Sequence, residues 1–171
     1  VKNLCKRYGD HTALSDLSFT IEKGQIYGFL GPNGAGKSTT MNIMTGCLAP
    51  SSGSVSIDGY DIFEDADEAK RRIGYLPELP PLYLDRTPRE YLTFVARAKK
   101  IPSAQIKEQV AHVMQVTQIS DVADRLIKNL SKGYKQRVGI AQAILGDPEV
   151  IILDEPTVGL DPKQIIEIRD L

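Results

Sequence analysis

Three glycines, a lysine and two hydroxyl side chains lie within nine consecutive residues of this chain. The stretch consists of Gly31, Pro32, Asn33, Gly34, Ala35, Gly36, Lys37, Ser38 and Thr39. It fits the pattern Gly-x4-Gly-Lys-Ser, in which glycines let successive backbone N–H groups turn toward an anion. Lys37 adds a positive charge for the outer phosphates of a nucleotide, and the Ser38 hydroxyl is a ligand for Mg²⁺. The stretch therefore predicts nucleoside triphosphate binding, against the alternative of a chance match.

Two flanking elements must hold this loop in place. The apolar run Ile26–Leu30 is typical of a buried strand, and the residues from Ser38 to Thr45 are typical of a helix. A helix that starts at the loop directs the positive end of its dipole at the phosphates. The expected order strand, loop, helix supports the phosphate-binding interpretation.

A pair of carboxylates follows the apolar run Val150–Leu153, which we expect to be a buried strand. Ligands of α/β sheets lie at the carboxyl ends of strands, where Asp154 and Glu155 would emerge. Asp154 can orient Mg²⁺ opposite Ser38, and Glu155 can polarise the water that attacks the γ-phosphate. By itself an Asp-Glu pair is more often a solvated strand end. The phosphate-binding loop favours the catalytic interpretation.

A third pattern, Leu130-Ser131-Lys132-Gly133-Tyr134-Lys135-Gln136-Arg137, opens a predicted helix. Ser131 is a helix cap, and Gly133 adds no side chain that would obstruct an anion at the helix end. An ordinary capped helix is the alternative. Together, the three motifs and their order resemble those of an ATP-binding-cassette (ABC) ATPase subunit, over nearly the whole chain.

The resemblance implies ATP and Mg²⁺ as cofactors and assigns a role to each matching residue. Residues Gly31 to Thr39 are similar to the Walker A loop, with Thr39 near the α-phosphate, and Glu155 corresponds to the catalytic base. Asp154 and Ser38 correspond to the Mg²⁺ ligands. Tyr8 resembles the aromatic residue that stacks on adenine, although a tyrosine on a strand face is the alternative.

The resemblance also implies partners. Ser131 and Gly133 are similar to the signature loop, which contacts ATP held by a second ABC ATPase subunit, of the same or a different chain. Asp161, in the stretch Gly159–Pro162, resembles the aspartate that spans the two sites. The segment Pro77–Tyr83 resembles the surface that meets a transmembrane permease, and no nucleic acid is expected. This places the subunit in the cytoplasm, peripheral on the inner face of the cell membrane.

Three departures from the family pattern refine the expectation. Lys132 and Tyr134 stand where the signature usually has Gly and Gln, and Glu78 stands where a glutamine is expected. A carboxylate can still reach Mg²⁺ or water, but it donates no hydrogen bond as an amide does. The versions Leu-Ser-Lys-Gly-Tyr and Tyr-Leu-Pro-Glu resemble bacterial exporter-type ATPases. Neither His11 nor His112 fits the switch histidine, so we expect the chain to be truncated before it.

The expected fold class is α/β, a P-loop ATPase core with an N-terminal antiparallel β subdomain and an inserted α-helical subdomain. Residues 1–78 and 147–171 would form the nucleotide-binding core with the β subdomain, and residues 79–146 the helical signature subdomain. Turns are expected at Gly9-Asp10 and Lys23-Gly24, and the alternation Leu17, Phe19, Ile21 predicts a strand face. A capping box at Thr87 and caps at Ser131 and Asp161 predict helix starts.

Composition restricts the remaining function classes. The formal net charge of −1 over 171 residues provides no positive field for nucleic acid or anionic lipid. The apolar runs are much shorter than the ~20 residues that span a bilayer, and no charged-then-apolar leader opens the sequence. Cys5 and Cys47 are the only cysteines, and we expect both to be reduced thiols rather than metal ligands.

Two alternatives to a transporter ATPase stay open from the sequence. One is a soluble ABC ATPase that acts on ribosomes or DNA, although no second cassette, coiled coil or basic extension is visible. The other is a nucleotide-binding module without efficient turnover.

Overall fold

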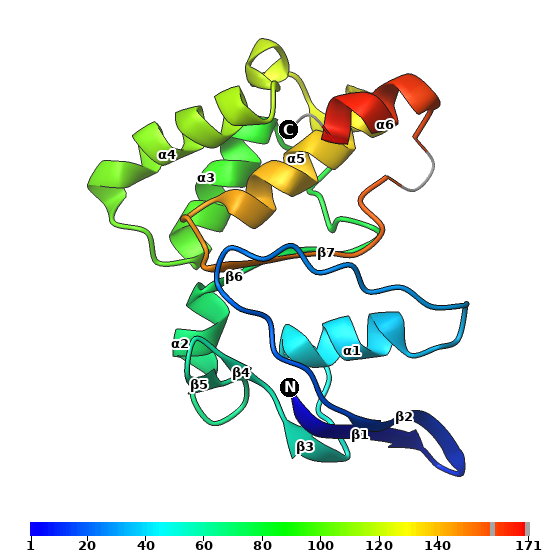
Figure 1. Ribbon diagram of the computed structural model, residues 1–171. Helices are drawn as coiled ribbons and strands as arrows, with labels where there is room; N and C mark the ends of the chain where they lie inside the picture. Colours follow the sequence, from blue (N-terminus) through cyan, green and yellow to red (C-terminus); the bar gives the residue numbers. More distant parts are fainter. Residues whose placement is uncertain (158–159, 170–171) are drawn as a thin grey trace. The chain divides into compact units, whose positions relative to one another are not determined.

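The computed structural model describes residues 1–157 and 160–169, which fall into two units, Val1–Ile73 and Gly74–Leu171 (Figure 1). The first unit opens with strands β1 (Lys2–Tyr8) and β2 (His11–Leu17), which pair antiparallel around the expected turn at Gly9. Strand β3 (Ser52–Ser54) pairs with the other edge of β1, so the sheet order is β2-β1-β3. Gly53 has φ +87° and lies so close to the Asn3 carbonyl that a Cβ would approach its oxygen to 2.4 Å. Only glycine therefore allows this pairing.

Two helices and a short hairpin complete the first unit. Helix α1 (Lys37–Met44) follows the glycine-rich loop, as the sequence predicts. Strands β4 (Ser56–Ile57) and β5 (Tyr60–Asp61) form an antiparallel hairpin, and α2 (Ala66–Arg71) comes next. The core of this unit consists of fully buried or nearly fully buried apolar side chains, including Leu4, Leu14, Ile43, Val55 and Ile62.

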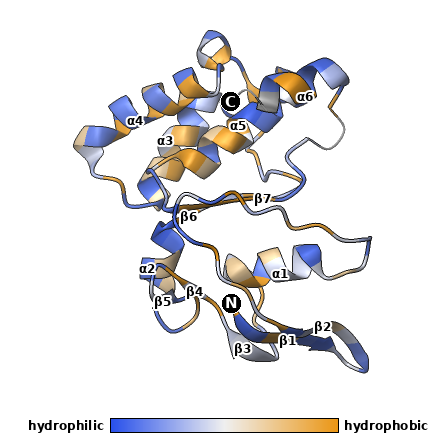
Figure 2. Cartoon of the chain, in the orientation of Figure 1, coloured by the Kyte–Doolittle hydropathy of each residue, from blue (hydrophilic) through white to orange (hydrophobic). Residues whose placement is uncertain are grey.

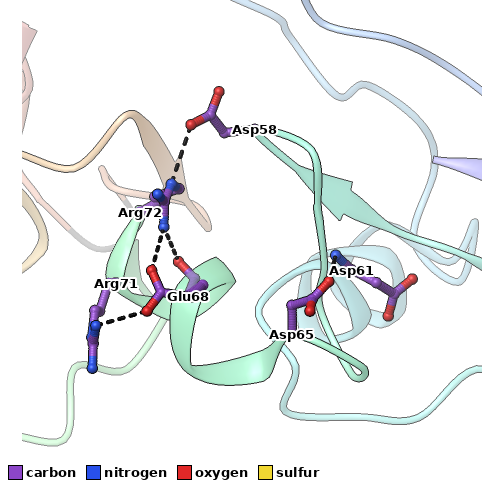
Figure 3. Close-up of polar contacts among 6 residues, drawn as sticks. All are labelled: Asp58, Asp61, Asp65, Glu68, Arg71 and Arg72. Atoms are coloured by element: carbon purple, nitrogen blue, oxygen red, sulfur yellow. Dashed lines mark hydrogen bonds and ion pairs between the residues drawn. The ribbon is translucent and has the colours of Figure 1, made fainter.

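Figure 3 shows the polar contacts that join the β4–β5 hairpin to α2. The Arg72 guanidinium donates to a carboxylate oxygen of Asp58 at 3.1 Å and to Glu68, and it lies 4.1 Å from the centre of the Tyr60 ring. Before α2, the backbone N–H of Asp61 donates to the Asp65 carboxylate at 3.2 Å. These acidic residues are thus used in structural contacts.

The expected strand over Ile26–Leu30 is wrong. No ladder among the described strands includes these residues, and Ile26 and Leu30 are almost entirely exposed. The preceding strand also ends at Leu17, short of the predicted alternation. An aromatic cluster replaces the ladder: the Phe19 ring centroid lies 5.7 Å from that of Tyr27 and 5.8 Å from that of Phe29. A strand needs a hydrogen-bonding neighbour, and an apolar run cannot supply that neighbour by itself.

The second unit contains β7 (Val150–Leu153), which is coloured as hydrophobic in Figure 2. It pairs with β6 (Ile73–Leu76), of which Gly74, Tyr75 and Leu76 belong to this unit. Its helices are α3 (Pro88–Ala98), α4 (Ser103–Val116), α5 (Lys132–Ile144) and α6 (Pro162–Arg169). Two short 3-10 helices, η1 (Ser120–Val122) and η2 (Ile127–Asn129), connect α4 to α5. The strand Val150–Leu153 and the helix starts at Thr87, Ser131 and Asp161 are confirmed, including the reciprocal capping box of Thr87 and Glu90.

The helices α3, α4 and α5 share one hydrophobic core. Ile106, Val110 and Val113 recur at helical spacing on α4, and they are buried in a cluster with residues of α3 and α5 such as Leu92 and Val138. All members of this cluster fall within residues 79–146. The mixed α/β class with an antiparallel N-terminal sheet is confirmed. The division of the chain into a core and an inserted helical subdomain stays a prediction.

Candidate functional site

The glycine-rich loop leads directly into α1, and its conformation depends on two glycines. Gly34 and Gly36 have φ values of +83° and +85°, in the left-handed region that favours glycine. A Cβ on Gly36 would lie 2.5 Å from a methyl carbon of Leu14 and 2.7 Å from the Ala13 carbonyl oxygen. The loop therefore packs against β2 at a point where no other residue fits. Residues from Gly31 to Ala35 are exposed to solvent.

Lys37 folds back over the loop that precedes it. Its Nζ donates to the Gly31 carbonyl at 2.6 Å and to the Pro32 carbonyl at 2.9 Å. The ammonium group thus lies over the loop backbone, where it can exchange carbonyl oxygens for phosphate oxygens. Ser38 is exposed in the first turn of α1, and Thr39 beside it is partly buried. Both hydroxyls lie at the positive end of the helix dipole.

Tyr8 ends β1, on the same sheet that supports the loop. It pairs with His11 across the turn, and its ring is half exposed. Ala13, which contacts Gly36, lies two residues further along β2, a rise of about 7 Å at ~3.3 Å per residue. The Lys6 ammonium lies 5.2 Å from the centre of the Tyr8 ring. Tyr8 therefore presents a half-exposed aromatic ring at the end of β1, which pairs with the strand that the loop contacts.

The carboxylates Asp154 and Glu155 follow β7, as the sequence predicts. Asp154 is buried, and its backbone N–H donates to the Leu76 carbonyl at 2.9 Å, next to the end of β6. Glu155 is exposed and has φ +47°, a left-handed conformation that costs a non-glycine residue about 1–2 kcal/mol. Glu78, also exposed, comes two residues after Leu76. The structure thus brings the ends of β6 and β7 together.

The start of α5 has the predicted cap. The Ser131 hydroxyl accepts a hydrogen bond from the Tyr134 N–H at 3.3 Å, and Ser131 itself is exposed. Gly133 is buried against α6, where a Cβ would lie 3.1 Å from the Gln164 side chain. Asp161 caps α6 by accepting from the Gln164 N–H at 2.9 Å. The signature glycine therefore contacts the helix that Asp161 begins, while Gly159 lies outside the described residues.

Tyr134, an unusual residue within the signature pattern, has a structural explanation. Its phenol donates to the Asp121 carboxylate at 2.8 Å, which joins α5 to η1. This hydrogen bond, with partial burial, raises the pKa of Tyr134. Sequence reasoning missed Asp121, because nothing local marks it as the partner of a residue in α5.

Sequence reasoning also missed the side chains that anchor α5 on its other faces. The Gln136 amide donates to the Pro156 carbonyl at 2.8 Å, and the Arg137 guanidinium donates to Glu167 at 2.7 Å and to Gln118 at 2.9 Å. Both Gln136 and Arg137 are buried. The sequence shows only two polar residues in a predicted helix, and their burial, which marks them as structural contacts, is visible only in the structure.

The predicted site residues divide between the two units. Tyr8 and the glycine-rich loop with Lys37, Ser38 and Thr39 belong to the first unit. The second unit holds Glu78, Ser131, Gly133, Asp154, Glu155 and Asp161. Each of these two groups of predicted site residues therefore lies within one unit.

The predicted Mg²⁺ ligands, Ser38 and Asp154, supply hard oxygen atoms. Among residues 1–157 and 160–169, no group of three or more His, Cys, Asp or Glu side chains could hold a metal ion. Mg²⁺ characteristically takes one or two protein oxygens and completes its shell with water and substrate phosphates. The Ser38 hydroxyl and the Asp154 carboxylate match this preference for one or two protein oxygens. Over the same described residues, no helix combines the length and apolar character needed to cross a membrane.

Comparison with known protein families matches residues 14–158 to the family described as ABC transporter. The uncharacterized ABC transporter ATP-binding protein YhcH of Bacillus subtilis (strain 168) is 43% identical over 170 residues, 99% of this chain and 55% of the relative. The bacitracin transport ATP-binding protein BcrA of Bacillus licheniformis is 41% identical over 169 residues, 99% of this chain and 54% of the relative.

A third relative is the Nod factor export ATP-binding protein I of Cupriavidus metallidurans, which is 37% identical over 163 residues. That match covers 95% of this chain and 54% of the relative. The chain spans about half the length of the curated relatives it matches.

Two solved structures are similar in fold and sequence. One is described as the ATP binding subunit of an ABC transporter, with a TM-score of 0.87 and 32% identity over 99% of this chain and 70% of that one. The other is cbiO1 from Clostridium perfringens, described as part of the ABC transporter complex cbiONQ. Its TM-score is 0.86 and its identity 34%, again over 99% of this chain and 70% of that one.

Proposed function

The chain belongs to the ABC transporter family of ATP-binding proteins, and from this we propose that it binds and hydrolyses ATP to drive transport through a membrane partner. The geometry of the glycine-rich loop supports this proposal most directly. Gly34 and Gly36 hold the left-handed turn before α1, and the Lys37 ammonium lies over the loop backbone. This combination presents backbone N–H groups, a helix end and a cation to one phosphate chain.

Each remaining site residue has a proposed role in this reaction. The Tyr8 ring stacks on adenine, and Thr39 binds near the α-phosphate. Ser38 and Asp154 hold Mg²⁺, which supplies positive charge to the phosphate oxygens. Glu155 accepts a proton from the attacking water, and Glu78 orients water or Mg²⁺ from the end of β6.

The exposed start of α5 supports a second subunit as a partner. Ser131 and Gly133 would contact ATP bound to the Lys37 loop of another ATPase subunit, while Asp161 would lie between the two sites. Each γ-phosphate would then be held by Lys37 of one copy and by the α5 end of the other. Hydrolysis removes the phosphate that links the halves, so the dimer reopens.

An exposed aromatic patch supports a membrane partner. Tyr83 and Phe94 are about half exposed, and the Tyr83 ring centroid lies 5.3 Å from that of Phe94 and 5.7 Å from that of the buried Tyr91. Leu79 and Leu84, close to Tyr83 in the sequence, are also exposed apolar residues. We propose that this patch, with the segment Pro77–Tyr83, receives a transmembrane permease and so holds the subunit on the inner face of the membrane. The name of the Nod factor relative, an export ATP-binding protein, favours export, whereas the name of BcrA states transport alone.

A substitution of the proposed base tests the reaction. In the full-length subunit, Glu155→Gln should retain ATP binding, lower kcat by at least ~100-fold because the general base is lost, and trap an ATP-bound dimer. Steady-state hydrolysis, nucleotide binding and size-exclusion chromatography with ATP measure the three effects. Glu108→Gln, an exposed carboxylate on α4, is the matched control. Wild-type turnover by Glu155→Gln would rule out Glu155 as the base.

A further inference from the structure

We propose that Gln136 is a positioning residue for Glu155. Its side chain connects the N-terminal end of α5, the proposed contact with the second subunit, to residues Asp154, Glu155 and Pro156 of its own subunit, which we call the catalytic loop. This inference rests on the proposed function, because it takes Glu155 to be the base. Gln136 lies in the helix that Ser131 caps, one turn beyond the signature loop. Its amide nitrogen donates to the carbonyl oxygen of Pro156, the residue after Glu155, at 2.8 Å.

The face of α5 that carries Gln136 is determined by helix periodicity. Gln136, Gly139 and Ala143 follow one another at i, i+3 and i+7, so they lie on one side of the helix. Gly139 and Ala143 contact β6: a Cβ on Gly139 would lie 2.6 Å from Leu76, and a Cβ on Gly74 would lie 2.1 Å from the Ala143 carbonyl oxygen. The same face therefore carries Gln136, whose hydrogen bond to Pro156 lies three residues beyond the end of β7.

The hydrogen bond is specific in direction. A proline has no N–H, so the backbone of Pro156 offers only an acceptor, and the Gln136 amide must present its NH2 group. Gln136 is only 6% exposed, which means that water cannot easily replace this donor. An apolar substitute would leave the Pro156 carbonyl without the Gln136 hydrogen bond.

Glu155 needs such support because its backbone is strained. Its φ of +47° is one that a glutamate rarely adopts, and it persists only when neighbouring contacts impose it. The Asp154 N–H, bonded to Leu76, holds the residue before Glu155, and Gln136 holds the residue after it. Glu155 itself is exposed, and these two hydrogen bonds hold the backbone on either side of it, from which its carboxylate extends.

The structure thereby links two functions within one chain. The N-terminal end of α5 is proposed to contact ATP on the second subunit, and the Gln136 side chain extends from that helix to the catalytic loop. A shift of α5 when the second subunit docks would move the Pro156 carbonyl and, with it, Glu155. Misplacement of a catalytic group by about 1 Å is enough to lower the rate ~100-fold.

The test compares two glutamines of α5 in the full-length subunit assembled with its membrane partner. Gln136→Met removes the donor to Pro156 with little change in volume. Gln142→Met is the matched control, because Gln142 accepts from the Tyr91 hydroxyl and lies away from the catalytic loop. We expect Gln136→Met to lower kcat for ATP hydrolysis ~10-fold or more with less than ~3-fold change in KM, since positioning affects chemistry rather than binding. Gln142→Met should keep kcat within ~2-fold of wild type.

A double variant separates positioning from general structural damage. If Gln136 acts through Glu155, Gln136→Met should not lower the residual rate of Glu155→Gln any further, because coupled residues are not additive. Equal losses of kcat in Gln136→Met and Gln142→Met, or a further loss in the Glu155→Gln background, would overturn the proposal. So would wild-type kcat in Gln136→Met while Glu155→Gln is inactive, a result that leaves the proposed function intact. Wild-type turnover by Glu155→Gln would instead refute the base assignment, and this inference with it.

Discussion

At the scale of single residues, Lys99, the partly buried C-cap residue of α3, makes contacts that the sequence motifs do not indicate. The Lys99 ammonium donates to the Leu145 carbonyl at 2.6 Å and to the Gln142 and Ala143 carbonyls at longer distances, all at the C-terminal end of α5. Burial lowers the pKa of Lys99 to about 8, from 10.5 in an exposed lysine. The Lys99 ammonium thus caps the C-terminal end of α5, the helix whose N-terminus Ser131 caps. Its partial burial removes water from the charged form, which costs free energy.

This pKa predicts how stability changes with pH. The folded protein releases the Lys99 proton near pH 8, whereas the unfolded chain keeps it until pH 10.5, so the unfolded state binds more protons in between. The free energy of unfolding should therefore rise from pH 8 to pH 10, by at most ~3 kcal/mol. Above pH 10 the buried Tyr91, with its pKa raised to about 12, acts in the opposite direction, because the unfolded chain then loses the tyrosine proton first.

Urea unfolding at pH 8, 9 and 10 measures this effect. Lys99→Met should abolish the rise, and Lys107→Met, at an exposed position of α4, should preserve it. A flat profile for the wild type would mean that the three carbonyls keep the ammonium protonated despite burial.

At the scale of elements, the contact between β6 and α5 positions the predicted site residues of the second unit. The contact requires glycine at position 74, because Gly74 has no side chain and faces the backbone of α5 at Ala143. Backbone atoms cannot move aside as a flexible side chain can, so the two elements approach as closely as glycine permits. The close contact between Gly74 and Ala143 thus fixes the position of α5 relative to β6 and its partner strand β7.

Gly74→Ala should therefore destabilise the second unit by about 3 kcal/mol, since the added Cβ would lie 2.1 Å from the Ala143 carbonyl oxygen. Gly28→Ala is the matched control: a Cβ there meets nothing within 4 Å, and the change should be neutral or stabilising by up to ~1 kcal/mol. Chemical denaturation of both variants gives the comparison. Equal stability of the two variants would show that β6 and α5 can separate without cost.

At the scale of the whole molecule, the proposed cycle requires partners beyond one chain. The chain spans about half the length of the curated relatives it matches, and its phosphate-binding loop and α5 end are proposed to serve different ATP molecules. The aromatic patch of Tyr83 and Phe94 is the proposed contact with the membrane partner. Contiguous exposed apolar patches on a protein surface commonly mark sites of interaction with other proteins.

The patch gives the prediction at this scale. In the full-length subunit, the double substitution Tyr83→Ser and Phe94→Ser should lower copurification with the permease at least ~10-fold, because the interface loses two aromatic anchors. ATP affinity of the isolated subunit should stay within ~2-fold of wild type, since neither ring lies in the ATP site. Phe63→Ser, at an exposed aromatic position of the first unit, is the control. Unchanged copurification of the double variant would exclude the patch as the contact.

The sequence by itself determined the elements and motifs whose signals are local. Gly36 and Lys37 identified the loop and the start of α1, Thr87 and Ser131 identified helix starts, and the apolar run before Asp154 identified β7. Each of these signals acts within about four residues of the chain, through capping, glycine conformation or periodicity. Such signals can be read without knowing what packs against them.

Only the tertiary structure decided which residues support those motifs. Tyr134 pairs with Asp121 across 13 residues of sequence, and Gln136 reaches Pro156 across 20, because helix packing brings them together. The run Ile26–Leu30 fails as a strand for the same reason: its apolar pattern is local, but a strand forms only with a ladder partner. The identity of the motifs is thus encoded locally, whereas their support depends on contacts that only the packed chain creates.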